Sequence, residues 1–100
     1  SPSKEDELID EAQLLCLDGE KENAFKCYKQ AFFISISELY NNISQKYNVA
    51  LKEDRKEIWE SNYPNIVRFF SKRMIPTGFS LNFEEYDSFD KVDKILSGNN

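Results

Sequence analysis

One hundred residues suffice for a single domain with a modest hydrophobic core, and we expect one domain over 1–100. Hydrophobic residues make up 40% of the chain and aromatic residues 14%, which argues against disorder. A net charge of −5 disfavours a stand-alone nucleic-acid binder, which usually presents a basic surface to phosphates. The chain has no histidine, so it lacks the commonest general base and the commonest transition-metal ligand.

Residues 3–18 carry the pattern of a first helix. Ser3 suits the N-cap, and the three acidic residues 5–7 suit the positive end of the helix dipole. The apolar residues share one face at helical spacing; they are Leu8, Ile9, Ala12, Leu15 and Cys16. Gly19 stands where a glycine commonly follows a helix, so a tight turn is predicted there.

Residues 21–47 predict one long second helix, because apolar residues recur at steps of three and four. This face consists of Phe25, Tyr28, Phe32, Ile36, Leu39 and Ile43, and Tyr47 extends it. Ala24, Cys27 and Ala31 lie beside the face, where their small size lets another helix come close. The first two helices are therefore expected to form an antiparallel hairpin at the centre of the fold.

The stretch over 50–74 allows two interpretations. A short helix over 50–61 would be followed by another over 64–74, because Pro64 suits the first turn of a helix. The first would bury Leu51, Ile58 and Trp59, and the second Ile66, Phe69 and Phe70, with Val67 and Met74 beside them. The alternative is a single kinked helix over 50–74.

The run Ile75-Pro76-Thr77-Gly78 predicts a break, and an extended segment over 76–87 is expected to follow it. Its apolar residues Phe79, Leu81 and Phe83 would attach it to the helices. A last helix is predicted over 88–97, capped by Asp87 or Ser88 and ended by Gly98, with Val92, Ile95 and Leu96 packed inward. The fold class is thus all-α, a bundle of four to five helices built on the N-terminal hairpin.

The pattern of Gly19, Ala24, Phe25, Tyr28, Ala31 and Phe32 resembles two known helical hairpins over residues 8–47. One is the tetratricopeptide hairpin, whose arrays need at least three stacked copies, whereas this chain shows one. The other is the opening hairpin of HEPN domains, which fits the single-domain size better; MIT domains look alike too. HEPN nucleases cleave RNA with an arginine and a histidine, but here histidine is absent and Arg55 is the first arginine. The resemblance therefore implies a non-catalytic relative that binds a partner.

The acidic segment contains Glu84, Glu85, Asp87, Asp90 and Asp93. Its spacing lacks the glycine and the terminal glutamate of an EF-hand loop, so we expect no metal there. Asp87-Ser88 also resembles a phosphopantetheine attachment motif, but only ten residues follow Asp90, and a helix cap is the better interpretation. A functional role for the acidic segment would be contact with a basic partner.

Trp59 and Tyr63 lie in the sequence between Arg55 and Arg68, and could form an aromatic and basic contact surface. Trp59 is more simply interpreted as a core residue. Arg68, Lys72 and Arg73 are the best candidates for a local basic patch.

No nucleophile–base arrangement is visible, so we expect no enzyme, no catalytic residue and no cofactor. We expect a cytoplasmic protein in which Cys16 and Cys27 are reduced and buried. The sequence contains no apolar run of about 18 residues, so no membrane span is predicted. The expected function is a protein-interaction or adaptor domain, or an accessory subunit, with another protein or a second copy as partner. The alternative is a non-catalytic HEPN-like component of an RNA-processing or toxin–antitoxin system. The sequence leaves open whether carboxylates far apart in the chain come together on folding to form an active site.

Overall fold

The computed structural model describes residues 3–46, 48–81 and 83–98. Within these ranges it contains four α-helices and no β-strand: α1 (Lys4–Leu17), α2 (Lys21–Asn41), α3 (Lys52–Met74) and α4 (Phe89–Leu96). A π-helical turn, Asn42–Lys46, continues α2, and 3-10 turns are formed by Ile75–Thr77 and Glu84–Tyr86. The all-α bundle on an N-terminal hairpin is confirmed. The predicted contribution of Tyr47 to α2 lies outside the described residues.

The α1–α2 hairpin is fixed at both ends of α1. The Ser3 hydroxyl accepts a hydrogen bond of 3.1 Å from the Asp6 amide, as expected of an N-cap. At the other end, the Gly19 amide donates to the Cys16 carbonyl (3.1 Å) and the Glu20 amide to the Leu15 carbonyl (2.9 Å), which is a Schellman turn. This turn needs a left-handed residue, and Gly19 has a φ of +79°.

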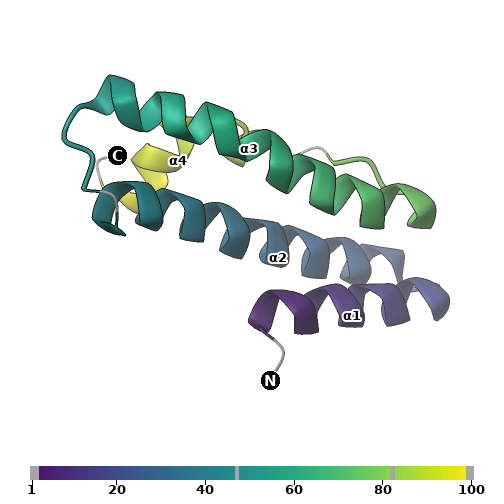
Figure 1. Ribbon diagram of the computed structural model, residues 1–100. Coiled ribbons are helices and arrows are strands. Elements are labelled where there is room, and N and C mark those ends of the chain that lie inside the picture. Colours follow the sequence, from purple (N-terminus) through teal and green to yellow (C-terminus); the bar gives the residue numbers. More distant parts are fainter. Residues whose placement is uncertain (1–2, 47, 82, 99–100) are drawn as a thin grey trace.

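Helix α2 is the centre of the molecule. Helices α1 and α3 lie on opposite sides of it, and α4 sits near the end where α2 finishes and α3 begins (Figure 1). Its fully buried side chains include Ala24 and Ala31, which belong to the small-residue face that the sequence predicts. Tyr28, Phe32 and Ile36 are also buried, so the aromatic face is confirmed.

Helix α3 runs without a break through Pro64, so the prediction of two separate helices is wrong and the single-helix alternative is correct. The inward stripe continues at helical spacing across the proline: Trp59, Tyr63, Ile66, Phe70 and Met74. Packing of this stripe outweighs the cost of a proline in a helix interior. Just before Pro64, the Ser61 hydroxyl donates a hydrogen bond to the Glu57 carbonyl. The side-chain amide of Asn62 donates one to the Ile58 carbonyl.

Two residues predicted to be buried by this stretch are exposed. Leu51 precedes the first turn of α3 and has 64% of its surface exposed, so it does not reach the core. Phe69 is 38% exposed because it lies outside the inward stripe, one residue before the buried Phe70.

The chain after α3 returns along the bundle and is attached by aromatic contacts, as predicted. The Phe83 ring lies 4.9 Å from that of Phe32 and 5.4 Å from that of Phe25, and Phe79 lies 5.7 Å from Phe25. The two 3-10 turns interrupt the segment that was expected to be extended throughout. Ile95 is 44% exposed, contrary to prediction, because α4 turns Phe89, Val92 and Leu96 inward.

Candidate functional site

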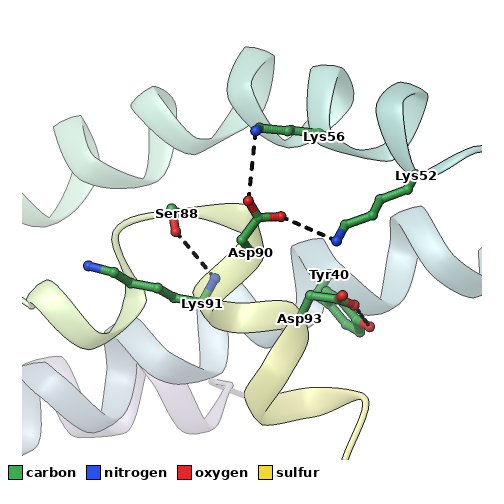
Figure 2. A network of polar contacts seen from close by, with 7 residues as sticks. All are labelled: Tyr40, Lys52, Lys56, Ser88, Asp90, Lys91 and Asp93. Carbon is green, nitrogen blue, oxygen red and sulfur yellow. Dashed lines mark hydrogen bonds and ion pairs between the residues drawn. The ribbon is translucent and has the colours of Figure 1, made fainter. Parts of the chain in front are cut away.

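The acidic segment forms a polar network that joins α4 to α2 and α3 (Figure 2). The Asp90 carboxylate lies 3.5 Å from the Lys52 ammonium and 3.8 Å from that of Lys56. The Tyr40 hydroxyl donates a hydrogen bond of 2.6 Å to Asp93. Ser88 caps α4, since its hydroxyl accepts a hydrogen bond of 3.2 Å from the Lys91 amide, so the helix-cap interpretation holds.

Two further carboxylates of the acidic segment are paired, whereas that of Glu84 forms no ion pair in the described residues. Glu85 forms an ion pair of 2.7 Å with Lys29 of α2, and Asp87 forms one of 2.7 Å with Lys91. The Lys91 ammonium donates to the Glu84 carbonyl as well. A basic partner would thus have to compete with the chain's own lysines, and the predicted contact role stays a prediction. Nowhere in the described ranges do three cysteine, aspartate or glutamate side chains gather as a metal site.

Of the two aromatic residues predicted as a contact surface, Trp59 faces inward, whereas the half-buried Tyr63 lines a surface hollow together with Arg68. Trp59 is 1% exposed, and its ring stacks on Tyr63 at 5.5 Å and meets Phe89 edge-on at 5.9 Å. Trp59 is therefore inaccessible to a partner. Its prediction as a contact residue is wrong, and its interpretation as a core residue is correct. Partial burial of the Tyr63 hydroxyl raises its pKa, and the negative charge of the nearby Asp87 raises it further.

Arg68 is exposed and belongs to a hollow of about 390 Å³ on the outer side of α3, here called the basic hollow. Its lining consists of Asn65, Arg68, Phe69, Lys72 and Arg73. The Arg68 guanidinium donates to Asn65 at 2.8 Å, and the Arg73 guanidinium lies 3.6 Å from the centre of the Phe69 ring. The basic patch predicted from sequence is therefore assembled on one surface, with an exposed aromatic ring in it.

Folding also brings together two carboxyl groups that the sequence did not single out. Glu5 of α1 accepts a hydrogen bond from the Ser35 hydroxyl and lies beside Glu38 of α2. Partial burial of the Glu38 carboxyl raises its pKa, and a hydrogen bond and like charge from Glu5 raise it further. No local signal predicts this pair, because its members are on different helices.

The two cysteines, Cys16 and Cys27, are free but only half-buried, so the prediction that they are buried is wrong. Burial raises the pKa of the Cys27 thiol, and the negative charge of Glu11 adds to the effect. The thiolate fraction of Cys27 is therefore low at neutral pH, which makes it a weak nucleophile.

The side of α2 that lies between α1 and Tyr86 carries a groove of about 470 Å³, here called the lysine groove. Its lining consists of Lys4 and Leu8 from α1, Lys26, Lys29, Gln30, Phe33 and Ile34 from α2, and Tyr86. Phe33, Ile34 and Tyr86 are half-buried although they pack against the core, and Lys4 and Lys26 are exposed. Sequence reasoning missed this groove because it followed the buried face of α2 alone.

Comparison of the chain with protein-family models, curated proteins and solved structures finds no match in any of the three. In the described residues, no helix is both long and apolar enough to cross a membrane. The candidate functional features are therefore those that the geometry identifies: the lysine groove, the basic hollow and the Glu5–Glu38 pair.

Proposed function

We propose that this chain is a non-enzymatic protein-interaction module, serving as an adaptor domain or as an accessory subunit of a larger complex. The observation that carries the proposal is the lysine groove. Helix α2 is packed by α1, by α3 and by the segment that leads into α4, but in the groove between α1 and Tyr86 it leaves half-buried apolar side chains beside three lysines.

The composition of the groove suits binding better than catalysis. Its lining contains no carboxyl group, thiol or aliphatic hydroxyl, so it offers no nucleophile with a base. An aromatic and aliphatic centre with charges around it is the common composition of a protein interface. The free thiols of Cys16 and Cys27 suit a reducing compartment, and we propose the cytoplasm.

Site-specific photo-crosslinking in the producing cell tests the proposal. A photoreactive phenylalanine in place of Gln30, which lines the groove, is expected to give a discrete adduct of higher mass. The same residue at Glu60, exposed on α3, is the matched control and should not give that adduct. A chain that stays uncrosslinked at Gln30 and turns over a substrate would contradict the proposal.

A second candidate is a non-catalytic HEPN-like component of an RNA-processing or toxin–antitoxin system. The basic hollow supports it, because three cationic side chains line it together with the exposed Phe69 ring, and the Arg73 guanidinium over that ring adds a planar cation on which a base could stack. An RNA-binding assay at low salt, where electrostatic affinity is greatest, separates the two candidates. Absence of binding there would count against the RNA candidate.

A further inference from the structure

The chain itself shows which chemistry this side of α2 accepts. At one end of the lysine groove, the Glu84–Tyr86 turn lies against α2. Glu85 binds the Lys29 ammonium at 2.7 Å, and the Tyr86 ring packs on Phe33 with 5.0 Å between the ring centres. The Lys29 ammonium also lies 6.0 Å from the centre of the Tyr86 ring. An acidic side chain followed by an aromatic one thus occupies this end of the groove.

The charges in this contact are matched. The hydrogen bond between the two side chains raises the pKa of Lys29 and lowers the pKa of Glu85. Each group therefore favours the charged form of the other, as in a charge-assisted hydrogen bond.

The same combination of groups continues along the groove. Lys26 is one helical turn before Lys29, so both ammonium groups project from one face of α2. Neither Lys26 nor Lys4 forms an ion pair with a carboxylate in the described part of the chain. Ile34 and Leu8 supply apolar surface next to these two lysines.

We propose that the lysine groove binds an acidic polypeptide segment bearing one large apolar or aromatic side chain, through contacts of the kind that Glu85 and Tyr86 make. The carboxylates of the bound segment reach Lys26 and Lys4, and its apolar side chain packs on Phe33 and Ile34. This inference rests on the proposed interaction function and specifies the partner. The occupant is a different protein rather than a second copy, because the chain's own acidic and aromatic pair, Glu85 and Tyr86, is already held by Lys29 and Phe33.

The recognition is local and depends on salt. The whole chain has a net charge of −5, which repels an acidic partner at long range. Glu5, the acidic neighbour of Lys4, is hydrogen bonded to Ser35 and does not line the groove. The attraction of the exposed Lys4 and Lys26 is screened within about 10 Å at 0.1 M salt, so affinity falls as salt rises.

Fluorescence anisotropy with a defined peptide tests the proposal. The probe is fluorescein-labelled Glu-Glu-Tyr-Glu-Glu-Tyr, two copies of the triplet that forms the Glu84–Tyr86 turn. We expect saturable binding at low salt, weakened at least about tenfold by Lys26→Glu and less than about twofold by Lys72→Glu, the same charge change outside the groove. Circular dichroism confirms that both variants, which change exposed side chains, keep the helical fold.

Two control peptides complete the experiment. A peptide with lysine for glutamate should not bind, and one with serine for tyrosine should bind much more weakly. Absence of binding at low salt, equal weakening by both variants, or equal binding of the serine peptide would each overturn the proposal. So would a concentration-dependent dimer that Lys26→Glu abolishes, because the groove would then hold a second copy. If the peptide fails while Gln30 still crosslinks a partner, the interaction function stands and the acidic specificity falls.

Discussion

The hydroxyl of Tyr40 donates a hydrogen bond of 2.6 Å to Oδ1 of Asp93, which lies 53 residues later in the chain. The bond joins α2 to α4, next to a stacked contact of 5.9 Å between the Tyr40 and Phe89 rings. Burial and this bond to a carboxylate raise the pKa of Tyr40, because both oppose the phenolate. A polar bond and an apolar contact therefore fix the C-terminal helix together.

Replacing Tyr40 by phenylalanine tests this attachment. Tyr40→Phe keeps the ring but removes the donor to Asp93, and we expect a loss of about 1–2 kcal/mol in the free energy of unfolding in urea. Asp93 is half-buried, so water compensates part of the lost bond. Tyr86→Phe is the control, since the Tyr86 hydroxyl makes no hydrogen bond within the described ranges. Equal losses in the two variants would contradict the assigned role.

The aromatic core predicts a larger effect at Phe32. This fully buried ring contacts Phe70, Phe83 and Tyr63, so Phe32→Ala leaves a cavity between α2, α3 and the returning segment. We expect a loss of about 3–5 kcal/mol and a lower melting temperature. Leu17→Ala, at a position 83% exposed, should change stability little. An unchanged melting midpoint for Phe32→Ala would refute the core assignment.

Pro64 predicts a stabilising substitution. It lies inside α3, where a proline ring crowds the carbonyl four residues earlier, that of Glu60. Proline also has no N–H group, so one helical hydrogen bond is lost. Pro64→Ala is expected to raise the free energy of unfolding by about 1–3 kcal/mol, after allowance for the greater freedom of the unfolded chain. Thermal unfolding measures the change. A lower melting temperature would show that the proline supports α3 rather than straining it.

The Glu5–Glu38 pair predicts a pH-dependent substitution. Because the pKa of Glu38 is raised above its ordinary value, protonated Glu38 favours the folded state at low pH, and this contribution is lost as the pH rises through the folded pKa. Glu38→Gln should therefore raise the melting temperature at pH 7 and change it little at pH 4. The gain should stay below about 1 kcal/mol, because the residue is largely exposed.

The control for this pH dependence is Glu60→Gln, which removes the same charge from an exposed position on α3. It changes the net charge equally, and the Glu60 carboxylate forms no ion pair in the described residues. Equal pH profiles for Glu38→Gln and Glu60→Gln would show that net charge alone causes the effect.

Local signals predicted most of the fold. Ser3, Gly19 and Ser88 mark helix ends through bonds to their own neighbours, and all three act as expected. The error at Pro64 has a different origin. Local preference places a helix start at proline, but the inward stripe from Trp59 to Met74 continues through it, and tertiary packing decides.

The candidate site was less predictable than the fold. The sequence identifies an acidic segment, but not that Glu85 pairs with Lys29 and Asp90 with Lys52 and Lys56. The lysine groove combines α1, α2 and Tyr86, so it exists only once these elements are packed. Residues far apart in the chain carry no periodic signal, and this explains why the Glu5–Glu38 pair was also missed.

A titration of the ¹⁵N-labelled chain with the Glu-Glu-Tyr-Glu-Glu-Tyr peptide, followed by amide chemical shifts, shows directly whether the lysine groove binds an acidic segment. We expect the largest shifts on the lysine groove, at Lys4, Lys26, Gln30 and Ile34, and we expect Lys26→Glu to reduce them strongly at the same peptide concentration. Shifts confined to the basic hollow around Arg68 and Lys72, or the absence of any shift at low salt, would contradict it.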